Sequence, residues 1–284
     1  MASFQNQAVL SYNGQTTTSN ITTGEIVEVL SATKEAVSNQ YEVNGKVTYV
    51  YSIQNTGATD FTNLTWEDNL GAYSLPEGSI EVTPLTYVAN SLCLYINGTL
   101  QQTPTISQTN PLMVEGLRVP ANGNAMLIYE AEINAYAPLN VGSTIVNTAI
   151  LSDNNRITPV SASETIYIEE TPNLTISKAL SPTTVTENGQ VTYTFTIQNF
   201  GNIDASSEAN VVIADLFNPI LNNLSIAYNG GALPTSSYSY DQDTGQFETL
   251  PGVVTVPSAS FTQSSTGEWQ ITPGVSTLSV TGTL

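Results

Sequence analysis

The chain has 284 residues, of which 40% are hydrophobic and 10% are charged, and its formal net charge is −19. This acidity argues against nucleic acid and anionic membrane surfaces as partners, because phosphate binding needs clustered lysine and arginine. Abundant Thr, Val, Ile and Tyr, beside turn-forming Asn and Gly, indicate an all-β protein, and a single cysteine excludes an internal disulfide framework.

The chain begins with a segment that recurs later. FQNQAVLS, residues 4–11, aligns without a gap with IVNTAILS, residues 145–152. The residues that share one face of the first strand are Phe4, Asn6, Ala8 and Leu10. Asn13-Gly14 then predicts a tight turn. We therefore predict that residues 1–27 form a donor β-hairpin of the kind that closes a β-domain, placed before any domain that it could close.

Residues 28–169 are predicted to form a complete immunoglobulin-like β-sandwich. SATKEAVSNQYEVNGKVTYVYSIQNTG, from Ser31, aligns without a gap with TISKALSPTTVTENGQVTYTFTIQNFG, from Thr175, which indicates a tandem duplication. VTYVYSIQN alternates at period two, and Asn-Gly pairs suit hairpin turns. Two tandem sandwiches fit this pattern. The first includes residues 145–168 as its own final hairpin.

Residues 170–284 are predicted to be an incomplete copy of the same sandwich. The second repeat reaches STLSVTGTL before any closing hairpin. Such a domain exposes apolar core and an unpaired strand edge, so we expect the N-terminal hairpin of another subunit to complete it by strand donation. The contact would be head-to-tail and would produce a filament. A closed ring and a reciprocally swapped dimer remain alternatives.

Each copy places polar residues on the apolar phase of its strands. The first set is Lys34, Asp68 and Asn147, and the second is Lys178 and Asp215 with Asn6 of the N-terminal hairpin. One interpretation is a buried ion pair hydrogen-bonded to asparagine. The other is an isopeptide bond, in which the lysine amine attacks the asparagine amide and ammonia leaves. Burial lowers the pKa of the lysine and raises that of the aspartate, which then shuttles protons.

The two predicted bonds differ in the chains that they join. Lys34 and Asn147 lie in one chain, whereas Lys178 of one subunit would react with Asn6 of the next and make the fibre covalent along its length. Glu130 and Glu132 in IYEAEIN are alternative acids. Beyond this autocatalytic step no enzyme activity is expected. With no histidine and no phosphate-binding glycine loop, we expect no cofactor and no metal site.

The location follows from what the sequence lacks. There is no 18-residue apolar run and no N-terminal segment with a basic region and an apolar core. We therefore expect no membrane insertion and no signal peptide, and an extracellular location or one at the cell or spore surface.

The same residues resemble a bacterial surface-protein repeat, the conserved Ig-like repeat catalogued as the eleventh domain of unknown function. The matching positions are Lys34, Val47, Tyr49, Asn55, Gly57, Asp68 and Asn147, then Lys178, Val191, Tyr193, Asn199, Gly201 and Asp215, with Asn6 completing the second set. The resemblance implies a stalk, adhesin or fimbrial subunit of Gram-positive bacteria, in which related pilin domains carry intramolecular isopeptide bonds. The chain shows no sorting motif and no hydrophobic anchor, so the expected setting is an endospore appendage assembled in the mother cell.

Two functions are therefore weighed. The first is a structural fibre subunit whose partner is another copy of itself, added head to tail. The second is a monomeric surface adhesin or stalk module that binds a glycan or a protein, with no ligand identified.

Overall fold

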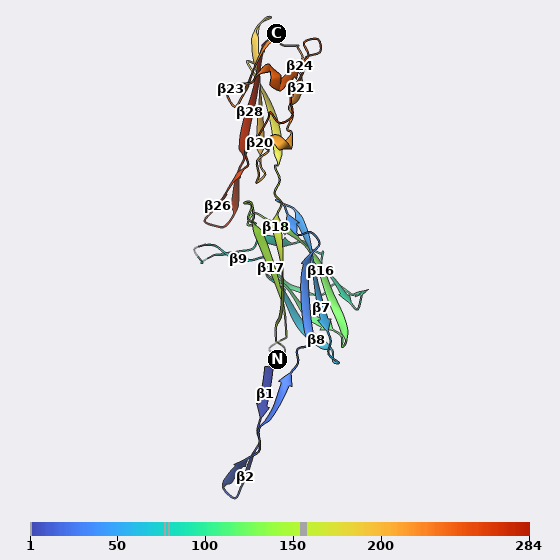
Figure 1. Ribbon diagram of the computed structural model, residues 1–284. Coiled ribbons are helices and arrows are strands. Elements are labelled where there is room, and N and C mark those ends of the chain that lie inside the picture. The colour runs from blue at the N-terminus through green and yellow to red at the C-terminus, as the bar shows by residue number, and fades with distance from the viewer. Residues whose placement is uncertain (1, 77, 79, 154–157) are drawn as a thin grey trace. The chain divides into compact units, whose positions relative to one another are not determined.

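The computed structural model describes residues 2–76, 78, 80–153 and 158–284 (Figure 1). The fold is all-β, as predicted, with two short 3₁₀ turns, η1 (Ser207–Ala209) and η2 (Thr235–Ser237). The chain divides into two compact units. Unit 1 comprises residues 1–134 with 145–166, and unit 2 comprises residues 135–144 with 167–284.

The N-terminal arm, residues 2–27, is a long hairpin (Figure 1). Its strands are β1 (Ala2–Asn6), β2 (Val9–Tyr12), β3 (Gln15–Thr18) and β4 (Thr22–Ile26). Asn13 and Gly14, with φ values of 45° and 75°, form the turn, as a tight hairpin requires. In the described part of the chain β1 pairs with β4 and β2 with β3, and neither ladder joins a sheet of the sandwiches.

Unit 1 contains two six-stranded sheets. The first consists of β5 (Leu30–Ala36), β7 (Lys46–Asn55), β16 (Gly123–Ile133), β12 (Cys93–Ile96) and β13 (Thr99–Leu100), with β11 (Leu85–Tyr87) also on β16. The second consists of β14 (Ile106–Thr109), β15 (Leu112–Val119), β8 (Phe61–Asp68), β17 (Thr144–Ser152), β18 (Val160–Ile168) and β6 (Gln40–Tyr41). A separate ladder joins β9 (Tyr73–Ser74) and β10 (Glu81–Val82).

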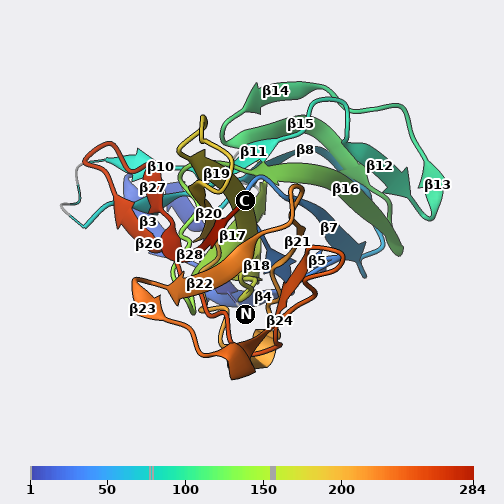
Figure 2. The same ribbon diagram turned by 90° about the horizontal axis from the view of Figure 1, so that it is seen from above.

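The two sheets of unit 1 pack face to face, with β14 and β15 over β16 and β7 in the view of Figure 2. Buried and exposed side chains alternate along β7, as a half-buried strand requires. Trp66 of β8 packs against Tyr51 of β7 at 5.8 Å and against Tyr129 of β16 at 5.6 Å between ring centroids. These aromatic rings form the centre of the core between the two sheets of unit 1.

The predicted closing hairpin of the first sandwich is present as β17 and β18, with β17 between β8 and β18. The buried residues of β17 are Ile145, Asn147, Ala149 and Leu151. Residues 135–144, expected within the first sandwich, belong instead to unit 2, where the Trp269 N–H donates to the Ala135 carbonyl at 2.8 Å.

Unit 2 has a five-stranded sheet, a three-stranded sheet and a hairpin. The large sheet consists of β19 (Leu174–Ser181), β20 (Gln190–Asn199), β28 (Gly274–Thr283), β22 (Asn222–Tyr228) and β23 (Gly231–Ala232). The small sheet consists of β21 (Ala214–Leu216), β25 (Gln246–Thr249) and β24 (Tyr238–Tyr240), and the hairpin of β26 (Ser260–Gln263) and β27 (Trp269–Thr272). In the core of unit 2, the ring centroids of Phe217 and Phe247 lie 5.9 Å apart.

The sheets of the two units differ at one edge. In unit 1, β8 pairs with β15 on one side and with β17 on the other. In unit 2, the equivalent strand β21 pairs with β25, and among the described residues no strand occupies its other edge. A sheet edge without a neighbouring strand is where a further strand can be added.

Candidate functional site

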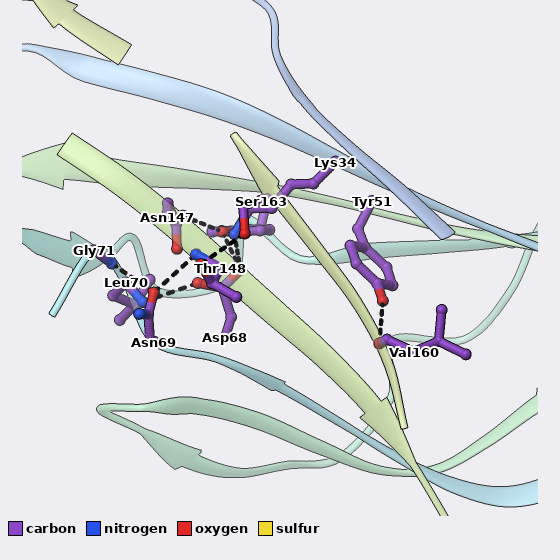
Figure 3. A network of polar contacts seen from close by, with 11 residues as sticks. Lys34, Tyr51, Asp68, Asn69, Leu70, Gly71, Asn147, Thr148, Val160 and Ser163 are labelled. Atoms are coloured by element: carbon purple, nitrogen blue, oxygen red, sulfur yellow. Dashed lines mark hydrogen bonds and ion pairs between the residues drawn. The ribbon is translucent and has the colours of Figure 1, made fainter. Parts of the chain in front are cut away.

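A buried polar cluster lies at the centre of unit 1 (Figure 3). Lys34 comes from β5, Asp68 from the end of β8 and Asn147 from β17. All three residues are buried, with exposed fractions of 4%, 0% and 0%. In the β17–β8 ladder Ala149 lies opposite Asp68. Asn147, two residues along β17, therefore shares the inward face with Ala149.

Three groups converge on the Asp68 carboxylate. Lys34 Nζ donates to Asp68 Oδ2 at 2.5 Å, and the Tyr129 hydroxyl donates to the same oxygen at 2.6 Å. The Leu70 N–H donates to Asp68 Oδ1 at 2.9 Å. The Asp68 carboxyl group is thus held by three donors, which are an amine, a phenol and a backbone N–H.

Burial makes the Lys34 amine easier to deprotonate. Desolvation lowers the pKa of Lys34 from 10.5 to about 8, although the negative charge of Asp68 opposes this change. The ammonium group also lies 5.0 Å from the ring centroid of Tyr49 and 5.9 Å from that of Tyr129. At neutral pH a larger fraction of such a lysine than of an exposed lysine is the neutral, nucleophilic amine.

The Asn147 carboxamide lies against the same cluster. Asn147 Nδ2 donates to the Tyr129 hydroxyl at 3.0 Å. Asn147 Oδ1 is buried and has no hydrogen-bond partner among the described residues. A buried polar atom without a partner is costly and needs an explanation. One is that the carboxamide is a reactant rather than a structural hydrogen-bonding group.

Unit 2 contains a second pair in the equivalent place. Lys178 of β19 is in contact with Asp215 of β21 through Nζ and Oδ2. Asp215 Oδ1 accepts from the N–H of the next residue, Leu216, at 3.0 Å, whereas Asp68 Oδ1 accepts from the N–H of Leu70, two residues along. Lys178 Nζ also lies 4.4 Å from the ring centroid of Tyr193.

The second pair differs from the first in its exposure. The side chains of Lys178 and Asp215 are 40% and 18% exposed, whereas those of Lys34 and Asp68 are both 0% exposed. Ile176, on the same face of β19 as Lys178, is 57% exposed. No asparagine side chain contacts this pair within the described ranges. Asn6, the predicted third member, lies in the arm with its side chain exposed.

The alternative acids do not join the cluster. Glu130 is half-buried and Glu132 is exposed. They alternate along β16 with the buried Tyr129, Ala131 and Ile133. The two glutamates therefore lie on the opposite face of the strand from the cluster, and the expectation that either replaces Asp68 is wrong.

Tyr129 is the member of the cluster that the sequence analysis missed. The alternation of IYEAEI could have identified it. This alternation places Tyr129 on the inward face of β16 and Glu130 on the opposite face. In the β16–β7 ladder Tyr129 lies opposite Tyr49. In the equivalent ladder of unit 2, Val280 lies opposite Tyr193. The second cluster thus has valine at the position of this tyrosine.

Within the described ranges, no helix is long and apolar enough to cross a bilayer. Nor do three or more His, Cys, Asp or Glu side chains of the described residues lie close enough together to hold a metal ion.

No protein-family model matches the chain, and no curated protein sequence matches it. Among solved structures, the chain is similar to BcpA, the major pilin subunit of Bacillus cereus, with 12% identity and a TM-score of 0.36 over 95% of this chain and 73% of that one. It is similar to the pilus backbone RrgB of Streptococcus pneumoniae, with 10% identity and a TM-score of 0.36 over 86% of this chain, and spans 55% of that structure. It is also similar to a collagen-binding domain of a Staphylococcus aureus adhesin, with 11% identity and a TM-score of 0.31, covering 48% of this chain and 96% of that domain. At these TM-scores the likeness supports no argument about function.

Proposed function

We propose that the protein is a structural subunit of an extracellular or spore-surface fibre and that it polymerises head to tail. The N-terminal arm of one subunit enters unit 2 of the next and takes the place beside β21 that β17 takes beside β8. The observation that carries the proposal is the contrast between two equivalent ion pairs. Lys34–Asp68 is covered by a strand that bears Asn147, whereas Lys178–Asp215 is open, and the exposed arm bears Asn6 in the same pattern.

The known ladder of unit 1 sets the register of the proposed contact. Ala149 lies opposite Asp68, and Leu151 lies opposite Trp66. The repeat aligns Ala8 and Leu10 with Ala149 and Leu151. In the proposed contact, Ala8 therefore lies opposite Asp215 of the neighbour, and Leu10 lies opposite its Ile213. Asn6 then reaches the Lys178–Asp215 pair as Asn147 reaches Lys34 and Asp68.

Burial of apolar side chains favours this contact. In the arm, Phe4 and Leu10 are 55% and 61% exposed, whereas their counterparts Ile145 and Leu151 are 2% and 0% exposed. Full burial of a large apolar side chain stabilises by roughly 1.5–3 kcal/mol. The free edge of β21 adds backbone hydrogen bonds.

The register can be tested with paired cysteines. Val9→Cys and Ala214→Cys would lie directly opposite on the outer face, so mild oxidation is expected to link subunits into disulfide ladders on a non-reducing gel. The background is Cys93→Ser with Asn6→Ala, so that no other covalent link contributes. Val9→Cys with Leu216→Cys, shifted by two residues on the same face, is the control. Equal linkage in both pairs would contradict the register.

Covalent locking follows from the chemistry of the two clusters. In unit 1, attack of Lys34 Nζ on Asn147 Cγ forms an amide within the chain and releases Asn147 Nδ2 as ammonia. In the fibre, Lys178 reacts with Asn6 of the neighbour in the same way. Docking of the arm would bury Lys178 as Lys34 is buried.

The intermolecular bond is tested directly by denaturing gels. Purified chains are expected to give ladders that survive boiling in detergent, and Asn6→Ala or Lys178→Ala is expected to abolish them while fibres remain visible by negative-stain microscopy. A 1:1 mixture of the two variants keeps one intact Asn6 and one intact Lys178, so covalent dimers should return. Detergent-resistant ladders in either variant alone would refute the assignment.

The intramolecular bond should form more slowly as pH rises above about 8. The proton that Lys34 gives to Asp68 is the one that the departing nitrogen needs, and the pKa of Lys34 is about 8. The rate is therefore expected to be level below this value, where the proton stays within the Lys34–Asp68 pair, and to fall about tenfold per pH unit above it. Intact-mass time courses of freshly translated chain, shifted into buffers of different pH, measure the loss of one ammonia. A rate that rises with pH up to this value would show instead that the amine must lose its proton to solvent.

A further inference from the structure

The Tyr129 hydroxyl lies between the acid and the leaving group of the proposed reaction. It donates to Asp68 Oδ2 at 2.6 Å and accepts from Asn147 Nδ2 at 3.0 Å. Lys34 Nζ lies 2.5 Å from the same carboxylate oxygen. A continuous hydrogen-bonded chain therefore runs from the nucleophile, through Asp68 and Tyr129, to the nitrogen that must depart.

The surroundings of Tyr129 keep its hydroxyl protonated. The residue is 0% exposed, and burial, with the charge of Asp68, raises the pKa of Tyr129 well above its usual range. A phenol that both donates and accepts can pass on one proton while it gains another. It ends the exchange in the form in which it began.

Resting on the proposed isopeptide chemistry, we propose that Tyr129 is a further catalytic residue that relays a proton from Asp68 to the departing nitrogen of Asn147. Lys34 first gives a proton to Asp68 Oδ2, and its neutral amine attacks Asn147 Cγ. In the tetrahedral intermediate Nδ2 is no longer conjugated with a carbonyl and becomes basic. Tyr129 gives it a proton and takes one from Asp68, so that both hydrogen bonds of the resting cluster reverse. The Cγ–Nδ2 bond breaks and ammonia leaves. The attacking nitrogen gives its surplus proton to the Asp68 carboxylate, and the neutral Lys34–Asn147 amide remains beside a protonated Asp68.

The same hydrogen bond orients the asparagine. A carboxamide has two similar ends, and the Nδ2–Oη bond turns the nitrogen toward the proton source. Expulsion of an unprotonated nitrogen is unfavourable. An acid placed beside Nδ2 therefore assists cleavage of the Cγ–Nδ2 bond. General acid–base groups of this kind contribute on the order of 10²–10⁴ in rate.

The second cluster provides a comparison within the molecule. Val280 occupies the register position of Tyr129, so Asp215 must protonate the departing nitrogen of Asn6 without this relay. The bond between subunits should therefore form more slowly than the bond within unit 1. Fibres would assemble first in a detergent-sensitive form and become covalent later.

The experiment compares two tyrosine variants in the full chain carrying Asn6→Ala, which prevents links between chains. Tyr129→Phe removes the relay hydroxyl and keeps the ring. Tyr51→Phe is the matched control, because its hydroxyl bonds to the Val160 carbonyl at 3.4 Å and not to the cluster. After a pulse of cell-free translation, intact mass follows ammonia loss with time, and near-ultraviolet circular dichroism checks folding.

Tyr129→Phe is expected to slow ammonia loss on the order of 10²-fold, while Tyr51→Phe reacts at the parent rate. Equal rates for a folded Tyr129→Phe and the parent would overturn the relay and leave the proposed bond standing. If the parent never loses ammonia, it stays without the internal bond, as Lys34→Ala must. That result would overturn both the bond and the relay. The two failures are thereby distinguished.

Discussion

A chain that lacks residues 1–27 is expected to stay monomeric at concentrations at which the full chain forms fibres. The arm pairs with itself in the described structure, so its removal deprives neither sandwich of a strand. It does remove the strand that is proposed to cover Lys178 and Asp215. Negative-stain microscopy and sedimentation of the two chains measure the difference.

A synthetic peptide of residues 1–27 tests directly whether the arm binds to unit 2. Added to the deleted chain, it should occupy the open edge of β21 and form a one-to-one adduct whose mass is the sum of both partners less one ammonia. The Asn6→Ala peptide is the matched control, and it should bind without a covalent bond. Added to the full chain, either peptide should shorten the fibres by capping acceptor sites.

Three outcomes would count against the proposed assembly. Fibres formed by the deleted chain would show that the arm is not the donor. A full chain that stays monodisperse and monomeric at high concentration would favour a monomeric surface module. A closed particle of fixed mass, rather than a fibre, would replace the filament with a ring or a swapped dimer.

The second large effect is expected from Lys34→Ala. This substitution leaves Asp68 buried without its cation and also removes the proposed internal cross-link. In chains whose Lys34 has not reacted, removal of one partner of the buried ion pair costs roughly 3–5 kcal/mol, and in reacted chains the loss of the cross-link destabilises unit 1. Unit 1 should therefore unfold at much lower denaturant concentration.

Trp66 is fully buried in unit 1 and reports its unfolding. A Trp269→Phe background removes the tryptophan of unit 2, so that fluorescence in guanidinium follows unit 1. Asn147→Ala, which loses the cross-link but keeps the ion pair, should be less destabilised than Lys34→Ala. Arg118→Ala, which breaks the exposed Arg118–Asp60 pair, should change little. An equally small effect of Lys34→Ala would contradict a structural role for the buried pair.

Much of this arrangement can be predicted from the sequence because strands alternate at period two. The polar residues on the apolar phase were visible as Lys34, Asp68 and Asn147 without knowledge of any contact. The structure brings these three together. Equivalent positions in the repeat then pointed to Lys178 and Asp215, which are also in contact.

Other members of the cluster could not be assigned in this way. Glu130 and Glu132 were plausible acids by residue type, but their phase along β16 places them outside. Tyr129 has the alternation of any inward-facing aromatic residue, and its hydrogen bonds to Asp68 of β8 and Asn147 of β17 depend on contacts distant in the chain. Residues 135–144 belong to unit 2 rather than to the first sandwich, and this too depends on contacts between residues distant in the chain.

Local alternation and self-similarity along the chain are enough to predict the β-class, the duplication, the resemblance of the arm to β17 and the face on which each polar side chain lies. They do not predict which acid contacts each lysine, that Tyr129 links Asp68 to Asn147, or that one ion pair is buried while the other is partly exposed. Those features depend on strand order and on the packing of one sheet against another, which a local pattern does not encode.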